Sequence, residues 1–195
     1  MDSKRAFDLA LGVPALIAAT PVLLGVAMYM RLSSDPGPVL YRARRMGEGG
    51  TIISVLKVRT MVVDAVGSNL TTAADPRVTR LGRLLRRYRI DELPQLINVV
   101  RGEMSLVGPR PEDPIFVDMR DPLHLRVFSA RPGITGLAQL EFHDEASLLT
   151  GPGAEQRYRE EILPAKLAFD VAYLDHRTTL LDLQILLRTV RVVLD

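Results

Sequence analysis

A long apolar segment near the N-terminus constrains this chain more than any other feature. Residues 7–30 are almost entirely apolar, interrupted by Asp8 near the start and by Pro14 and Pro21. As a helix, the segment is about long enough to cross the hydrocarbon core of a bilayer. It lacks a convincing small-residue cleavage site, so a secretory signal peptide is the less favoured interpretation. The sequence therefore predicts a membrane protein.

The charges around this segment predict that both of its ends lie on the cytoplasmic side of the membrane. Lys4 and Arg5 precede it, and several arginines follow it: Arg31, Arg42, Arg44 and Arg45. Basic flanks favour the cytoplasm. Pro21 removes a backbone hydrogen bond near the middle of the segment, where the Thr20 hydroxyl can bond to a freed carbonyl. We expect a bent, re-entrant helix over residues 1–32; a single-pass anchor is the alternative.

The remaining residues, 33–195, have room for one compact domain. The whole chain has 195 residues, of which 47% are hydrophobic, and its lack of cysteine excludes disulfides and thiolate metal sites. Short strands are predicted at residues 39–41 and 51–56, on either side of a glycine-rich turn. Apolar spacing predicts amphipathic helices at residues 81–88 and 180–194. A further helix is expected within residues 112–128, with these buried positions: Phe116, Met119, Leu123 and Val127. The expected fold class is a helix-dominated α+β domain with one small β-hairpin and several amphipathic helices on the membrane surface.

Two adjacent carboxylates, Asp91 and Glu92, lie between a cluster of arginines and the Gly-Pro-Arg-Pro turn at 108–111. Leu93 precedes a proline and is expected to be extended, whereas Pro94 suits the first turn of a helix. The carboxylates are therefore predicted just before a helix N-terminus, where anions are favoured. A carboxylate among arginines stays ionised, can attack phosphorus and can share a divalent cation with phosphates. A simple helix cap with solvated arginines is the alternative.

The residues around this pair carry a long and specific motif. Residues 89–111 read Arg-x-Asp-Glu-Leu-Pro-Gln-Leu-x-Asn-Val-x-x-Gly-x-Met-Ser-x-Val-Gly-Pro-Arg-Pro. This string closely resembles the bacterial sugar transferases that are monotopic polyprenyl-phosphate phosphoglycosyl transferases. Lys57-Val58-Arg59-Thr60-Met61, residues 132–139 and residues 169–174 resemble further family strings, although Val58 replaces an aromatic residue. Thr20-Pro21 takes the place of the Ser-Pro pair that breaks the family's re-entrant helix.

The resemblance implies an enzyme that moves a phosphosugar from a UDP-sugar to polyprenyl (undecaprenyl) phosphate. Asp91 matches the family's nucleophile, which attacks the β-phosphate, releases UMP and carries the phosphosugar covalently. This reaction initiates glycoconjugate or exopolysaccharide synthesis. The family also requires Mg²⁺, which Asp91 is expected to bind together with the diphosphate. Glu92 is the second catalytic acid, and it either assists the metal or accepts a proton from the incoming phosphate.

Several basic and rigid residues are expected to bind the substrates: Lys57, Arg59, Arg86, Pro109, Arg110, Pro111 and Arg131. Arg86 and Arg110 match family arginines and are expected to hold phosphate oxygens bidentately. The two prolines around Arg110 should preorganise it. For Lys57 and Arg59, phosphate contact and structural pairing with acids both remain open.

The expected partners are a UDP-sugar, polyprenyl phosphate and membrane lipid. Nucleic acid is not expected, because aromatic residues make up 5% of the chain, tryptophan is absent and no nucleic-acid module is recognisable. The expected location is the cytoplasmic face of the bacterial inner membrane. A catalytically silent membrane scaffold of polysaccharide assembly is the alternative function. Neither the sugar nor the oligomeric state can be inferred from the sequence.

Overall fold

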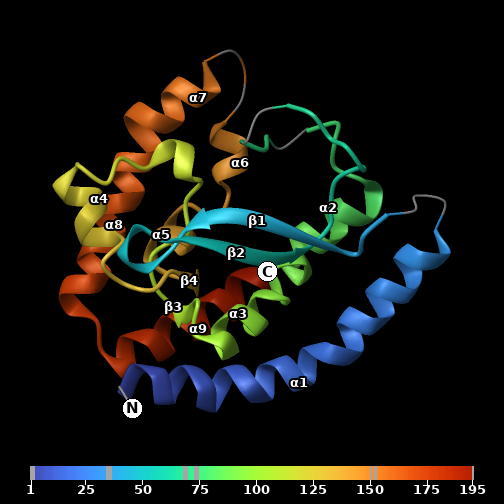
Figure 1. Ribbon diagram of the computed structural model, residues 1–195, viewed down its shortest axis with the longest axis horizontal. Helices are drawn as coiled ribbons and strands as arrows, with labels where there is room; N and C mark the ends of the chain where they lie inside the picture. The colour runs from blue at the N-terminus through green and yellow to red at the C-terminus, as the bar shows by residue number, and fades with distance from the viewer. Residues whose placement is uncertain are drawn as a thin grey trace.

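The N-terminal apolar segment forms one long helix. The computed structural model describes residues 3–33, 37–67, 70–72, 75–149, 151 and 153–194. Helix α1 spans Ser3–Leu32 and includes both Pro14 and Pro21. It runs along one edge of the molecule, and its second half turns away from the line of the first half (Figure 1). The bend is consistent with a proline-containing helix.

The Thr20 hydroxyl bonds to a different carbonyl from the one predicted. Pro21 lacks the N–H that would normally reach the carbonyl of Ile17, four residues earlier. Thr20 Oγ1 instead donates to the carbonyl of Leu16 at 2.8 Å. Such back-bonding from a threonine tends to bend a helix rather than to repair the proline gap.

The predicted β-hairpin is confirmed and is longer than expected. Strand β1 (Leu40–Met46) pairs antiparallel with β2 (Ile52–Val58), and Leu40 faces Val58. The turn η1 (Glu48–Gly50) contains Gly49 and Gly50 at φ values of 67° and 76°. These left-handed conformations favour glycine, which explains the glycine-rich turn.

Two short helices flank the carboxylate pair. Helix α2 spans Arg80–Arg87 and confirms the helix predicted at residues 81–88, with Leu85 buried and Leu84 exposed. The 3₁₀ turn η2 (Ile90–Glu92) contains both acids, and α3 follows at Gln95–Arg101 with Pro94 at its N-cap. The carboxylates thus directly precede a helix, as predicted.

The prediction that Leu93 would be extended is wrong. Leu93 has helical angles of φ −55° and ψ −35°. Its N–H bonds to the carbonyl of Ile90 at 3.2 Å, and its carbonyl accepts from the N–H of Leu96 at 3.1 Å. These bonds join η2 to α3 and outweigh the pre-proline preference for extended backbone.

A second, parallel strand pair was not predicted. Strands β3 (Ser105–Val107) and β4 (Gly133–Thr135) pair parallel and have three residues each. The two strands approach very closely: a Cβ on Gly133 would lie 2.1 Å from the backbone nitrogen of Gly108. The pair therefore presses the turn at residues 108–111 against the segment that follows β4.

The helix expected within residues 112–128 is confirmed as α4 (Pro122–Val127), and a 3₁₀ turn that was not predicted, η3 (Pro114–Phe116), precedes it. Each begins with a proline after a capping aspartate, so the prolines divide the segment into two short pieces. The expected burial is largely correct: Phe116 and Val127 are buried, and Met119 and Leu123 pack against the same cluster.

Helices dominate the C-terminal part of the chain. They are α5 (Leu137–Glu141), α6 (Glu145–Leu148), α7 (Ala154–Arg157), the π-helical turn η4 (Tyr158–Ile162), α8 (Leu163–His176) and α9 (Thr179–Leu194). Helix α9 confirms the predicted C-terminal helix. The main core joins α1, the hairpin, α3, α8 and α9, with Ala19, Val55, Val99, Tyr173 and Ile185 among its members.

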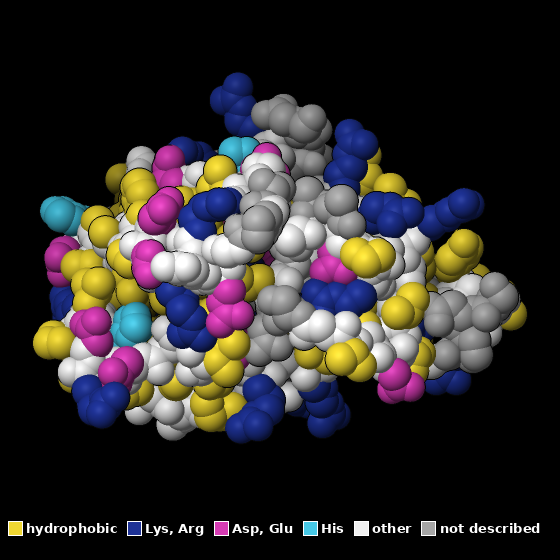
Figure 2. Space-filling view, turned by 90° about the horizontal axis from the view of Figure 1, so that it is seen from above, with side chains coloured by type: hydrophobic (Ala, Val, Ile, Leu, Met, Phe, Trp, Pro, Cys, Tyr) yellow, Lys and Arg dark blue, Asp and Glu magenta, His cyan; other side chains and the backbone are white. Residues whose placement is uncertain are grey.

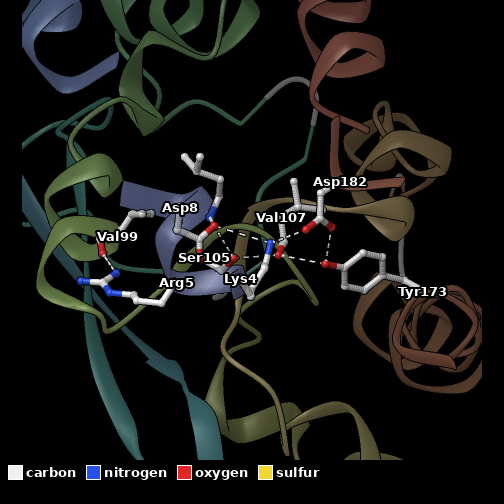
Figure 3. A network of polar contacts seen from close by, with 9 residues as sticks. Lys4, Arg5, Asp8, Val99, Ser105, Val107, Tyr173 and Asp182 are labelled. Atoms are coloured by element: carbon white, nitrogen blue, oxygen red, sulfur yellow. Dashed lines mark hydrogen bonds and ion pairs between the residues drawn. The ribbon is translucent and has the colours of Figure 1, made fainter. Parts of the chain in front are cut away.

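Polar contacts fix the first turns of α1 to this core (Figure 3). Asp8 is almost fully buried, and its Oδ1 accepts from the Ser105 hydroxyl at 2.9 Å and from the Leu106 N–H at 3.1 Å. Lys4 Nζ lies 2.8 Å from Asp182 Oδ2 on α9, and Tyr173 donates to the other oxygen of Asp182 at 2.7 Å.

Arg5 adds a contact with the end of α3. Its guanidinium donates to the carbonyls of Val99 and Val100, the latter at 2.7 Å. Carbonyls at a helix C-terminus lack intrahelical partners, so a cation there is favourable. The N-terminal end of α1 is therefore bound to α3, β3 and α9 of the folded domain.

The opposite face of α1 is apolar and exposed. Its exposed large side chains are Leu11, Val13, Ile17, Val22, Leu24, Met28, Tyr29 and Leu32. In the most apolar 18-residue stretch of this helix, only 11% of the residues are buried. Helix α9 exposes a second apolar set: Leu180, Leu183, Leu187, Val190 and Val192. Exposed apolar area of this size on two helices is typical of a membrane-binding surface.

Candidate functional site

One large cavity collects most of the residues singled out by the sequence. Its volume is about 990 Å³. The end of β2, helix α2, the turn η2, the segment after β3 and the α5–α6 segment form its walls. The predicted residues that line it are Lys57, Arg59, Arg86, Asp91, Glu92, Arg110 and Pro111.

Asp91 lies in the wall of this cavity and is only 7% exposed. Burial raises the pKa of Asp91, and the neighbouring charge of Glu92 raises it further, while Lys57 and Arg86 oppose the shift. Arg89, which opens the turn, adopts a left-handed φ of 50°. Within the described part of the chain, no ion pair engages the Asp91 carboxylate. Asp91 is thus a buried acid whose oxygens are available to a ligand.

Glu92 is held by two cations of the protein itself. Lys57 Nζ lies 2.9 Å from Glu92 Oε1, and Arg89 Nη1 lies 3.3 Å from Glu92 Oε2. Burial opposes ionisation of Glu92, but Lys57, Arg110 and Arg89 outweigh it and lower its pKa to about 2. The two adjacent acids therefore have different environments: Glu92 is paired and Asp91 is not.

Arg86 reaches the cavity from helix α2. Its Nε donates to the Thr60 hydroxyl at 2.9 Å, which fixes the guanidinium next to the end of the hairpin. Burial lowers the pKa of Arg86, and Asp91 is the acid that offsets this most. Because an arginine stays charged even when partly buried, this cation is poised for an anionic ligand.

Arg110 enters from the turn between Pro109 and Pro111. Its backbone nitrogen donates to Asp170 Oδ2 at 3.4 Å. Burial works against its charge, but Glu145, Glu92 and Glu112 outweigh burial and raise its pKa. Across the described ranges, no carboxylate comes within ion-pair distance of the guanidinium. Like Arg86, Arg110 retains donors for a phosphate.

A buried network behind Arg110 was missed by the sequence reasoning. Lys166 Nζ lies 2.7 Å from Glu112 Oε1, 2.8 Å from Glu145 Oε2 and 2.9 Å from the Tyr158 hydroxyl. Tyr158 donates to Glu112 Oε2 at 2.6 Å. A lysine on the apolar face of α8 was the available signal, because a buried lysine needs acidic partners. The network ties α6 and α8 to the residue that follows Pro111.

Three predicted substrate contacts have partners within the protein. Arg59 donates to the backbone carbonyls of Pro38 at 2.9 Å and Met61 at 3.0 Å and also lines the cavity, so its substrate contact stays a prediction. Arg131 pairs with Glu48 of the hairpin turn at 3.0 Å and is not among the residues that line the cavity. Lys57 pairs with Glu92 and also lines the cavity, so both alternatives for this residue stay open.

The donor set fits a magnesium ion only if the substrate supplies further ligands. Over the residues that the structure describes, no group of three His, Cys, Asp or Glu side chains could hold a metal. Asp91 offers one buried carboxylate without an ion-pair partner. Mg²⁺ commonly binds one or two carboxylates, substrate phosphates and waters, so a single aspartate facing a phosphate site fits that chemistry.

Comparison with known proteins gives a consistent set of relatives. A family model described as bacterial sugar transferase matches residues 2–195. The UDP-glucose:undecaprenyl-phosphate glucose-1-phosphate transferase of Caulobacter vibrioides is 42% identical over 96% of this chain and 68% of that protein. The UDP-N-acetylgalactosamine-undecaprenyl-phosphate N-acetylgalactosaminephosphotransferase of Aeromonas hydrophila is 35% identical over 98% of this chain and 43% of its own length. The exopolysaccharide production protein PSS of Rhizobium leguminosarum bv. phaseoli is 38% identical over 96% of this chain and 92% of its own length.

Proposed function

Because this chain belongs to the bacterial sugar transferase family, we propose that it transfers a sugar phosphate from a UDP-sugar to undecaprenyl phosphate. The observation that carries the proposal is the arrangement of Asp91, Arg86 and Arg110. A buried acid and two arginines, none with an ion-pair partner among the described residues, line one cavity. Such an arrangement suits a nucleophile that attacks a bound diphosphate.

In the first step, an oxygen of Asp91 attacks the β-phosphorus of the UDP-sugar. The new bond joins the aspartate oxygen to phosphorus, the bond from the β-phosphorus to the bridging oxygen breaks, and UMP leaves with that oxygen. In the second step, a phosphate oxygen of undecaprenyl phosphate attacks the same phosphorus and releases the carboxylate. Arg86 and Arg110 hold the phosphate oxygens and stabilise their charge through both steps.

A magnesium ion bound by Asp91 and the diphosphate would neutralise part of the negative charge that opposes this attack. Two arginines of the chain would also neutralise this negative charge, and they lie on two sides of the cavity. Arg86 lies on the α2 side of the cavity and Arg110 on the side of the turn after β3.

The ion pairs of Glu92 support a positioning role rather than proton transfer. A carboxylate whose pKa is near 2 is a weak base at neutral pH. The acceptor needs little help, because a phosphate monoester has its second pKa near ~6 and is largely dianionic at pH 7. We therefore propose that Glu92, through its ion pairs with Lys57 and Arg89, holds the η2 turn in place and keeps these two cations near Asp91.

The contacts of α1 support a monotopic position in the membrane. Lys4, Arg5 and Asp8 bind the folded domain at the start of the helix, and the chain after Leu32 returns to the same domain as β1. A helix that crossed the bilayer would place its two ends on opposite sides. We propose that α1 enters and leaves by the cytoplasmic leaflet, with its apolar face in lipid.

Release of UMP in the absence of lipid acceptor tests the proposed chemistry. Purified protein is mixed with Mg²⁺ and either UDP-glucose or UDP-N-acetylgalactosamine. One UMP per active protein should appear in a burst, and turnover should begin only when undecaprenyl phosphate is added. Asp91→Asn should abolish both phases, and Glu92→Gln should weaken turnover while sparing some of the burst.

The control is Asp175→Asn, since Asp175 forms an exposed pair with Arg126. This variant should behave as wild type. Normal turnover by the Asp91→Asn protein would refute the nucleophile. An absolute need for undecaprenyl phosphate before any UMP appears would instead indicate direct displacement. Absence of UMP under every condition would favour the silent scaffold.

A further inference from the structure

The side-chain amide of Gln139 has no hydrogen-bond partner, although it is buried in the wall of the reaction cavity. Gln139 is 4% exposed, and neither Oε1 nor Nε2 has a partner among the described residues. Leaving both atoms of a buried amide unsatisfied is costly. Oε1 accepts and Nε2 donates, so a matching group must offer a donor and an acceptor side by side.

A buried water is the competing explanation for this amide. Gln139 also borders a small pocket of about 10 Å³, next to Thr135, Arg89 and Thr189. That volume is at the lower limit of what one water needs. A single water there could bond to only part of the amide.

The fold places Gln139 beside the turn that carries Arg110. A Cβ on Gly136 would lie 2.3 Å from the carbonyl oxygen of Gly108 and 2.7 Å from Gln139 Oε1. Only a glycine at position 136 permits this approach. The pairing of β3 with β4 therefore brings the amide to the Arg110 side of the cavity.

Two parts of the cavity differ in charge. Arg77, Arg83, Arg86 and Arg87 line the cavity near α2, whereas the acids Glu112, Asp113, Asp144 and Glu145 share another part of the lining with Arg45, Arg110 and Lys166. Lys166 pairs with Glu112 and Glu145, and Arg45 pairs with Asp113, so most charges of that part are balanced by ion pairs. On the face seen in Figure 2, most acidic side chains lie on the left, the side of α4 and α8.

We propose that Gln139 and the α5–α6 wall form the subsite for the sugar ring of the nucleotide sugar. This inference rests on the proposed function. The arginine-rich part near α2 suits the phosphate of the leaving UMP, so the neutral sugar, on the other side of the β-phosphate, extends to the part of the cavity where ion pairs balance the charges. Sugar hydroxyls donate and accept, which matches the amide of Gln139, and Phe142, one helical turn later, lines the same cavity.

The experiment separates recognition of the sugar from recognition of the nucleotide. Burst rates of UMP release are measured against UDP-glucose and UDP-N-acetylgalactosamine concentration for wild type, Gln139→Leu and Gln139→Met. The inhibition constant of UDP, which lacks the sugar, is measured in the same proteins. Gln156→Leu is the matched control, because Gln156 is exposed and bonds only to Glu160 among the described residues. Thermal midpoints are recorded for all variants, and Met replaces Leu as the test variant if the Leu protein does not fold.

The sugar subsite predicts that Gln139→Leu lowers the ratio of burst rate to half-saturating concentration by about 10- to 100-fold for at least one UDP-sugar. The inhibition constant of UDP should stay within about twofold of wild type, and the thermal midpoint should not fall, since leucine removes an unsatisfied amide. An equal rise in the UDP inhibition constant would overturn the inference in favour of uracil recognition. No change in either quantity would overturn it in favour of a buried water. Absence of UMP from wild type would instead reject the proposed function.

Discussion

Lys57 Nζ lies 2.9 Å from Glu92 Oε1, and this ion pair joins the end of strand β2 to the residue next to Asp91. The side chains of Lys57 and Glu92 are 25% and 12% exposed, so water screens the pair only partly. Arg89 holds the other oxygen of Glu92. The hairpin and the η2 turn are thus connected at the reaction centre by charge.

Replacing Lys57 by methionine should weaken both stability and chemistry. Glu92 would keep only Arg89, and we expect a loss of about 1–3 kcal/mol in the free energy of unfolding and a burst rate lower by about tenfold or more. Arg126→Met is the matched control, because its pair with Asp175 is 54% and 48% exposed and should contribute less than ~1 kcal/mol. Equal effects of the two substitutions would contradict a special role for Lys57.

A methyl group at Gly82 should displace helix α2 from the hairpin. A Cβ at this position would lie 2.0 Å from the carbonyl oxygen of Thr60, the residue whose hydroxyl holds Arg86. Gly82→Ala should therefore cost about 1–3 kcal/mol and lower the burst rate, despite the better helix propensity of alanine. Chemical denaturation and burst kinetics measure the two effects.

Gly25→Ala provides the comparison, because a Cβ there meets nothing within 4 Å. It should leave stability unchanged or raise it by up to ~1 kcal/mol. If Gly82→Ala were equally harmless, the close contact between α2 and Thr60 would not be required.

Asp170 should make the fold less stable as the pH rises. Burial raises its pKa to about 8 from an ordinary value of 3.8, so the folded protein holds this proton more tightly than the unfolded chain does. The favourable contribution is complete below about pH 4 and is lost as the pH rises through 8. In the wild type, the free energy of unfolding should fall on the order of a few kcal/mol as the pH rises. Asp170→Asn, which mimics the neutral acid, should remove this fall. Denaturation at pH 5 and pH 8.5 measures it, and an equal effect of the substitution at both pH values would contradict the prediction.

Cysteines introduced at Ser3 and Ser33 should both resist an impermeant thiol reagent added outside intact cells. These residues lie at the two ends of α1, and the first turns of the helix contact α3, β3 and α9. Both cysteines should react after the cells are opened. Labelling of the Ser3→Cys protein alone in intact cells would show that α1 spans the membrane.

The sequence predicts the site better than it predicts the local backbone around it. Asp91, Glu92, Arg86 and Arg110 were expected to act together, and they line one cavity. Chemistry constrains such residues directly, because a hydrophobic core alone would not require a buried acid and two arginines that have no ion-pair partner among the described residues. Leu93 shows the limit, since hydrogen bonds from neighbouring turns decided its conformation.

Contacts between distant segments account for what the sequence did not reveal. Lys166 and Glu112 are 54 positions apart, and no local pattern pairs them. Strands β3 and β4 have three residues each, too few for a periodic signal. Arg131 is 83 positions from its partner Glu48 in the hairpin turn, which no local pattern indicates, and its role in substrate binding stays a prediction.

The contact between Lys4 and Asp182 joins residues that are 178 positions apart. A ribosome therefore delivers α1 to the membrane long before it has made the partner of Lys4 on α9. The partners of Asp8, which are Ser105 and Leu106, are made earlier, so α1 can attach to β3 before it attaches to α9. The contact between Lys4 and Asp182 is thus the last of these attachments to form. A chain shortened before Thr179 would lack the partner of Lys4, but Arg5 and Asp8 would still hold α1 against α3 and β3.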